Sequence, residues 1–214
     1  ADDPRRQDSW IDHRISVFKR GEGISVFKIV DIDKDGDLDI VAANHQGGIY
    51  ILENNYPEKG RGEWKRYEVS RDHEGTGHDY REIDVGDIDG DNDIDIIVAD
   101  EGENQVIWFQ NDGRTVYDGW KEYVIDKSDL YLRWCHSVRL GDIDGDGDMD
   151  LFVGGRLTPG SYPLAPRSYV LENDGTGRFR DVSEKLNPEL LRPGMVTDAL
   201  WTDFNQDDLP DLIL

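Results

Sequence analysis

The chain has 214 residues, of which 36% are hydrophobic and 10% aromatic, enough to build a folded core despite its acidity. Its 47 acidic and 24 basic side chains give a formal charge of -23, which disfavours binding to nucleic acids or anionic membranes and favours binding of cations. No apolar run reaches the roughly 18 residues that a membrane-spanning helix needs, and the single cysteine, Cys135, excludes an internal disulfide framework.

In chain order, residues 1–9 are predicted to be an N-terminal extension, and Trp10–Phe18 is predicted to be the last strand of a repeat unit. A complete unit then follows. Its predicted elements are a strand around Phe27 and Ile29, an aspartate-rich loop at Asp31–Asp39, a dense apolar strand from Leu38, a third strand from Ile49 and a fourth from Trp64. Short stretches rich in β-branched and aromatic residues, separated by Asn, Asp and Gly, favour antiparallel strands over helices.

The same order of elements returns along the chain. The counterparts of the first loop are Asp87–Asp95, Asp142–Asp150 and, more loosely, Asp203–Asp211. Radially repeated sheets of four strands are the blades of a β-propeller. We therefore predict an all-β protein, a β-propeller of four-stranded antiparallel blades with three complete units and partial blades at both ends. The only candidate helix lies around residues 183–191.

The last residues, Leu209–Leu214, end inside an apolar strand. An open strand edge of this kind tends to pair with another strand. We favour the interpretation that the chain is part of a larger propeller. The alternative is that another segment or a neighbouring chain completes the last sheet by strand addition, which would make the protein a subunit of an assembly.

Each repeated loop has the side chains of a metal site. Oxygen-bearing side chains at loop positions 1, 3, 5 and 9, with the main-chain carbonyl of position 7, can converge on one ion. An acidic turn without a metal is the alternative, but several carboxylates about 4 Å apart repel one another unless a cation neutralises them. The predicted ligands are Asp31, Asp33, Asp35, Asp37 and Asp39; Asp87, Asp89, Asp91, Asp93 and Asp95; Asp142, Asp144, Asp146, Asp148 and Asp150; and Asp203, Asn205, Asp207, Leu209 and Asp211.

Calcium fits these loops better than other metals. It accepts six to eight oxygen ligands in forgiving geometry, whereas magnesium requires a strict octahedron and zinc favours His and Cys. Position 6 must turn sharply, and Gly36, Asn92 and Gly147 suit a left-handed conformation. We predict three calcium sites and a fourth at Asp203–Asp211, where Pro210 and the missing glycine weaken the match.

The Asp-x-Asp-x-Asp-Gly-x-x-Asp loop between two strands, with a downstream Asn-Asp-Gly turn, resembles the FG-GAP or VCBS repeat over residues 10–214. This is the calcium-loop blade of integrin α-subunit propellers and of many secreted proteins. The resemblance implies a propeller of usually seven or eight blades. It places the calcium loops on the connections between the first and second strands of each blade.

With calcium at one end of the blades, a ligand site is expected at the other, where the second-to-third connections and the links between blades lie. The candidate ligand-binding residues there are His45, His78, Tyr80, Arg81, Trp134, His136 and Arg156. A purely structural role as rim or interior residues is the alternative. No serine elbow, phosphate loop or Cys/His metal spacing appears, and neighbours on a strand such as Cys135 and His136 point to opposite faces.

We therefore expect an extracellular or cell-surface calcium-binding propeller that acts as a binding or scaffold module for a protein or glycan. Millimolar extracellular calcium suits weak surface sites of this kind. The alternative function is a polysaccharide lyase or sugar dehydratase with its site at the end opposite the calcium loops.

Overall fold

The computed structural model describes residues 23–55, 64–70, 77–125, 135–158, 160–207 and 209–214. The N-terminal extension, the strand predicted at Trp10–Phe18 and the candidate ligand-binding residue Trp134 lie outside the described residues. No helix in the described part of the chain has the length and apolar character needed to cross a membrane.

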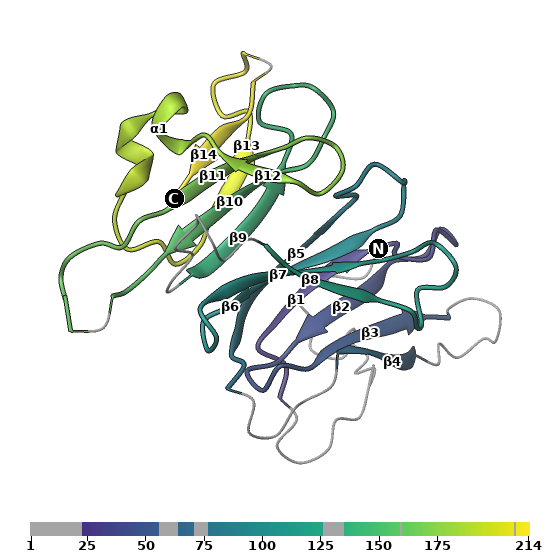
Figure 1. Cartoon of the computed structure of the whole chain (residues 1–214). Coiled ribbons are helices and arrows are strands. Elements are labelled where there is room, and N and C mark those ends of the chain that lie inside the picture. Colours follow the sequence, from purple (N-terminus) through teal and green to yellow (C-terminus); the bar gives the residue numbers. More distant parts are fainter. Residues whose placement is uncertain (1–22, 56–63, 71–76, 126–134, 159, 208) are drawn as a thin grey trace, which may run out of the picture.

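Three antiparallel four-stranded sheets follow one another along the chain, and each uses its four strands in sequence order (Figure 1). The first sheet contains β1 (Val26–Val30), β2 (Asp39–Ala43), β3 (Ile49–Asn54) and β4 (Trp64–Ser70). The second contains β5 (Tyr80–Gly86), β6 (Asp95–Asp100), β7 (Gln105–Gln110) and β8 (Lys121–Ile125). The third contains β9 (Cys135–Gly141), β10 (Asp150–Gly155), β11 (Tyr169–Asn173) and β12 (Phe179–Asp181). The predicted repeat of four strands is confirmed in all three sheets.

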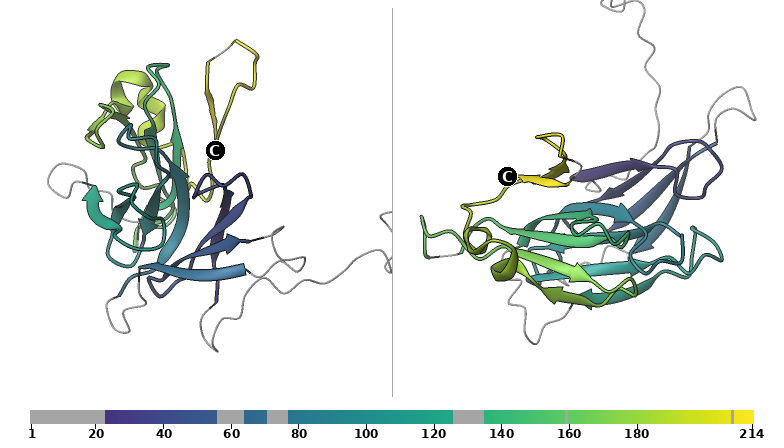
Figure 2. Two further views of the ribbon diagram at one scale, coloured as in Figure 1. Left: turned by 90° about the vertical axis from the view of Figure 1, so that its right-hand side faces the viewer. Right: turned by 90° about the horizontal axis from the view of Figure 1, so that it is seen from above.

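The chain closes with a short hairpin of β13 (Leu200–Thr202) and β14 (Asp211–Ile213), which projects from the other sheets in Figure 2. Between β12 and this hairpin lie the one-turn helix α1 (Ser183–Leu186) and the 3-10 helix η2 (Pro188–Leu191). Both short helices fall in the single segment where a helix was expected.

The sheets pack face to face, and the alternation of side chains along each strand explains how. Successive residues of a strand point to opposite faces. In β6, Ile96 and Val98 join a core cluster shared with the first sheet, whereas Ile97 and Ala99 join a second cluster shared with the third sheet. The middle sheet is therefore apolar on both faces. A third cluster packs the outer face of the third sheet, through Phe152, against the C-terminal segment.

The first strands of successive sheets lie next to one another. Asp84 on β5 pairs with Lys28 on β1 at 3.2 Å, and its other oxygen accepts a hydrogen bond from the backbone N–H of Leu140 on β9 at 2.9 Å. Arg139 on β9 extends the polar contacts, because it pairs with Glu82 on β5 at 3.2 Å and donates to the carbonyl of Ala199 at 2.6 Å. Polar side chains thus join the first strands of three sheets.

The two ends of this stack carry exposed apolar side chains. On β1, Val26 and Val30 face the core, so Phe27 and Ile29 point the other way and are 56% and 59% exposed. In the C-terminal hairpin, Leu200 on β13 is 56% exposed in the same manner. Sheet faces of this composition are normally covered by another layer.

Candidate metal centres

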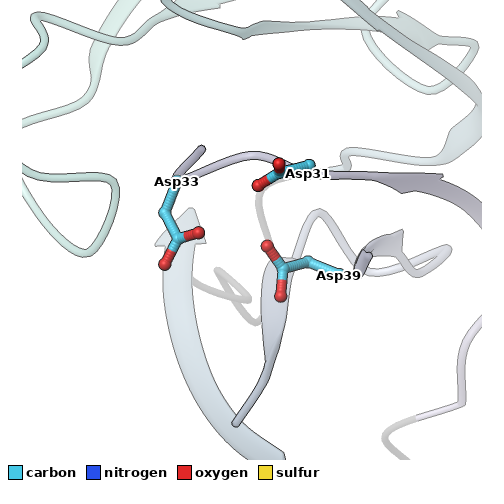
Figure 3. A group of neighbouring side chains, drawn as sticks. All are labelled: Asp31, Asp33 and Asp39. Carbon is cyan, nitrogen blue, oxygen red and sulfur yellow. The ribbon is translucent and has the colours of Figure 1, made fainter. Parts of the chain in front are cut away.

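The three complete loops connect the first and second strands of their sheets, as the resemblance implied. In each, three carboxylates have oxygen atoms within 4.8 Å of one another. Figure 3 shows the first of these groups, in which Asp31, Asp33 and Asp39 gather around one space. The groups are Asp31, Asp33 and Asp39; Asp87, Asp89 and Asp95; and Asp142, Asp144 and Asp146. Positions 1 and 3 therefore meet in every loop, joined by position 9 in two loops and by position 5 in the third.

The aspartate at position 9 closes each loop. In the second loop, Asp95 accepts the backbone N–H of Ile88 at 3.1 Å and, through its other oxygen, the backbone N–H of Asn111 at 2.7 Å. Asp39 and Asp150 make the same two contacts in their sheets. Each of these carboxylates joins the start of its loop to the turn between the third and fourth strands, so it has a structural role in addition to any metal contact.

Burial disfavours the charged form of the position-9 carboxylates. Desolvation raises the pKa of Asp95 to about 7 and that of Asp39 to about 6, although backbone hydrogen bonds partly oppose the shift. Burial also raises the pKa of Asp150. A bound cation would favour the charged form of all three, because an opposite charge within a few ångströms stabilises a carboxylate.

The loop backbone turns through two left-handed positions. At position 6, Gly36, Asn92 and Gly147 have φ values of 95°, 71° and 97°, as predicted. Sequence reasoning missed position 4, where Lys34 also has a positive φ, of 61°. Its counterparts Gly90, Gly145 and Gln206 also have positive φ values. The sequence signal for this turn was a glycine or polar residue at position 4 in every copy of the loop.

The donor set fits a hard cation. Buried Asp31 Oδ1 and Asp89 Oδ1 have no hydrogen-bond partner among the described residues, and a buried carboxylate oxygen without a partner is costly. Each of these aspartates belongs to a group of three converging carboxylates. A divalent ion with oxygen ligands would satisfy these atoms, whereas a zinc site would call for His or Cys.

The predicted ligands at positions 5 and 7 have local contacts of their own, and one of them, Asp146, also belongs to a converging group. The position-5 residues Asp35, Asp91 and Asp146 are exposed, and each accepts the backbone N–H of position 7 at 2.9 Å. The position-7 side chains of Asp93 and Asp148 lie against Gly113 and Gly175, where a Cβ atom would collide with them. Both glycines also have positive φ values, 70° and 73°, so the backbone of the downstream Asn-Asp-Gly turn favours glycine at this position.

The asparagine of this turn is a second element that sequence reasoning undervalued. Asn54, Asn111 and Asn173 each donate their side-chain amide to the carbonyl of loop position 8, at 3.2, 3.3 and 3.0 Å. The same residues donate their backbone N–H to the position-9 aspartate. The repeated asparagine was visible in the sequence, and its side chain supports the acidic loop from the neighbouring turn.

The fourth loop is only partly alike. Asp211 accepts the backbone N–H of Phe204 at 2.9 Å, which repeats the closing contact of position 9. Asp203 accepts the backbone N–H of Asp207 at position 5, whereas in the other loops the position-1 aspartate accepts the N–H of position 6. Asp207 accepts the backbone N–H of Leu209. Its side chains do not form a group of three converging carboxylates among the described residues. A fourth site, with Asn205 as a further ligand, stays a prediction.

The fold and these loops define a class: an all-β repeat protein whose sheets each carry an acidic loop between the first two strands. The model of the FG-GAP-like repeat matches residues 31–98 and again 87–153, and each match starts on the first aspartate of a loop. Together the matches cover more than half of the chain, so the chain belongs to the FG-GAP-like repeat family. A search of curated proteins found no match to the chain.

At the opposite end of the sheets, the structure brings several candidate ligand-binding residues into one charged network. His45 pairs with Asp79 at 2.9 Å, and Arg81 bridges Asp79 and Glu101. His136 accepts a hydrogen bond from Arg156 at 3.0 Å. Burial, and then the charge of Arg156, lower the pKa of His136, so the ring is held in its neutral form.

Two other candidates at this end have structural contacts. His78 bonds at 2.6 Å to Asp100, a fully buried carboxylate that also accepts the side chain of Gln105. Tyr80 is 2% exposed and packs in the core between the first two sheets, so we leave it out of the ligand face. Cys135 is also buried, and burial raises the pKa of its thiol to about 12, which agrees with a packing role.

Proposed function

We propose that this chain is a calcium-binding module in which an ion in each acidic loop stiffens its sheet. The observation that carries the proposal is the convergence of the carboxylates of loop positions 1 and 3 with a third carboxylate in three sheets, with buried, partnerless oxygen atoms in two of them. Repulsion among these carboxylates opposes folding, and a calcium ion would convert it into attraction.

We further propose that the sheets are blades of a β-propeller. The side-by-side placement of β1, β5 and β9 supports this, because first strands line the axis of a propeller. The exposed apolar faces at both ends of the stack, which include Phe27 and Leu200, support the presence of further sheets of the same kind against them.

In this proposal the module acts outside the cell or at its surface, where millimolar calcium fills weak sites. Its partner, a protein or a glycan, binds at the end opposite the calcium loops. The charged network around His45, Arg81, His136 and Arg156 supplies donors there.

Thermal unfolding in calcium and in excess chelator tests the calcium role. A site filled at ten times its Kd contributes about 1.4 kcal/mol, so three sites contribute about 4 kcal/mol and raise Tm by roughly 10 °C. Magnesium at the same concentration should raise Tm much less. Equal Tm values in calcium and chelator would refute the proposal.

A single-site variant sharpens the test. Asp89→Asn should remove one calcium ion from the stoichiometry measured by isothermal titration calorimetry, because Asp89 carries a partnerless buried oxygen in the second loop. Glu184→Gln is the control, since Glu184 is exposed and lies in α1, outside the loops and their contacts. Loss of a site in both variants, or in neither, would contradict the assignment of the second loop.

The outer faces favour a second candidate, a subunit completed by neighbouring chains. If Phe27 and Leu200 are covered by another copy, the chain should form concentration-dependent oligomers in sedimentation velocity experiments. Phe27→Lys should then abolish them. A monomer at all concentrations would exclude this candidate.

A further inference from the structure

A tyrosine of the second sheet reaches into the metal loop of the first. Tyr117 belongs to the connection between β7 and β8, and its hydroxyl lies 2.9 Å from Oδ2 of Asp33, the position-3 residue of the first loop. The same hydroxyl lies 2.7 Å from Oε1 of Glu53 on β3. Glu53 is 7% exposed, and its other oxygen accepts the hydroxyl of Tyr67 at 2.9 Å. The rings of Tyr67 and Tyr117 stack with centroids 4.0 Å apart.

The single hydroxyl proton of Tyr117 cannot serve both of its carboxylate contacts. A phenol is protonated at neutral pH and has a single O–H, so Tyr117 can donate to Asp33 or to Glu53 but not to both at once. The other carboxylate then faces the hydroxyl oxygen without a hydrogen between them. Lys65 pairs at 3.5 Å with the other oxygen of Glu53, Oε2. A cation at the first loop would balance the pair.

The other two sheets place a related side chain at the position of Glu53, immediately before the turn asparagine. In the second sheet this residue is Gln110, whose amide donates directly to Asp89, the position-3 residue of its own loop. In the third sheet it is Glu172, which lines a small cavity together with Asp144 and Asp150. Position 3 is thus bonded to this strand residue in the second sheet, shares the Tyr117 hydroxyl with it in the first and lines one cavity with it in the third. Among the described contacts, only in the first loop does the position-3 side chain bond to a side chain of the next sheet.

A second contact joins the same loop to the second sheet. Lys34, next to Asp33, pairs with Asp93 of the second loop at 3.1 Å and donates to the carbonyl of Asn92. A cavity of about 320 Å³ lies between the first loop and the β7–β8 connection, and Asp33, Lys34, Asp93 and Tyr117 are part of its lining. Positions 3 and 4 of the first loop are thus both attached to the neighbouring sheet.

We propose that Glu53 and Tyr117 belong to the first calcium site and make it a junction between the first two sheets. Tyr117 is a positioning residue that holds Asp33 in its ligand orientation, and Glu53 adds a buried negative charge that strengthens calcium binding. The inference rests on the proposed calcium function. Because coupling between two sites is reciprocal, calcium in the first loop also holds residues 111–120 against the first sheet.

The test compares calcium binding of the whole chain with that of Tyr117→Phe by isothermal titration calorimetry. Loss of a hydrogen bond to a carboxylate should weaken one calcium site about tenfold and leave the others unchanged. Tyr162→Phe is the matched control, because Tyr162 is 75% exposed and lies in the β10–β11 connection, away from the calcium loops. Hydrogen exchange provides the second measurement, in which calcium should protect residues 111–120 in the parent chain and much less in Tyr117→Phe.

A double-mutant cycle separates positioning from general stability. Asp33→Asn removes the ligand on which Tyr117 acts, so in that background Tyr117→Phe should have little further effect on calcium binding. Glu53→Gln keeps the shape of the side chain and removes its charge, and it should weaken the same site even if Tyr117→Phe fails to fold. Absence of calcium binding in the parent chain would overturn the proposed function itself. Normal calcium binding by both Tyr117→Phe and Glu53→Gln would overturn only the junction.

Discussion

Asn173 offers a stringent test of how the sheets support one another's loops. Its side chain, at the end of β11 and 3% exposed, donates to the carbonyl of Ile88 in the second loop at 2.7 Å and to the carbonyl of Met149 in its own loop at 3.0 Å. Its amide oxygen accepts the backbone N–H of Gly177 at 3.1 Å. One side chain therefore links the turn of the third sheet to the acidic loop of the second.

Asn173→Ala removes these three hydrogen bonds and leaves the buried carbonyl of Ile88 without this donor. At about 1 kcal/mol for each bond, the free energy of unfolding should fall by about 3 kcal/mol, and by more if the Ile88 carbonyl finds no water. The backbone N–H of Asn173 still donates to Asp150 in the variant, so the closing contact of the third loop is kept.

Asn111→Ala is the matched control. Asn111 occupies the same place in the second sheet, but its side chain makes two longer bonds, to the carbonyl of Ile94 at 3.3 Å and from the N–H of Gly113 at 3.2 Å, both within its own sheet. We expect a loss of about 1–2 kcal/mol. Urea unfolding of both variants in saturating calcium measures the difference. Equal losses would refute the claim that the bond between sheets contributes to stability.

Two further predictions concern packing and protonation. Gly177→Ala should destabilise the fold by about 2–5 kcal/mol, because φ is 77° and the new Cβ would overlap the buried ring of Trp108. Gly145→Ala is the control, with φ of 80° and open space around the position. It should lower the free energy of unfolding by only about 1–2 kcal/mol in the same urea assay. Similar losses in the two variants would contradict the role of the Trp108 contact. In calcium-depleted buffer, we expect the parent chain to lose stability relative to Asp95→Asn as the pH rises from about 4 to 8. Burial raises the folded-state pKa of Asp95 from 3.8 to about 7, so between these pH values the folded state binds a proton that the unfolded state has released. The free energy of unfolding therefore falls as the pH rises through this range. The difference between the two unfolding curves should reach at most about 4 kcal/mol, and parallel curves would show that Asp95 ionises without cost.

Local patterns in the sequence were sufficient for the repeat, the strands and the composition of the loops. In the first two loops the aspartates at positions 1, 3 and 9 converge because a nine-residue loop between two paired strands brings its own ends together. The pairing of Val30 with Asp39 depends only on nearby residues. The left-handed turn at Gly36 follows from the same local geometry.

Only the tertiary structure decided which groups reach a loop from another sheet. Tyr117 lies 84 residues from Asp33 in sequence, and Asn173 lies 85 residues from Ile88. Their contacts depend on how one sheet is rotated and shifted against the next, which is set by the packing of whole faces such as Ile97 and Ala99 against the third sheet. The same packing buried Tyr80, although its sequence neighbours Asp79 and Arg81 belong to the charged network at the opposite end. Strand periodicity determines which face a side chain occupies, but the partner on that face comes from a distant part of the chain, and only the assembled sheets bring the two together.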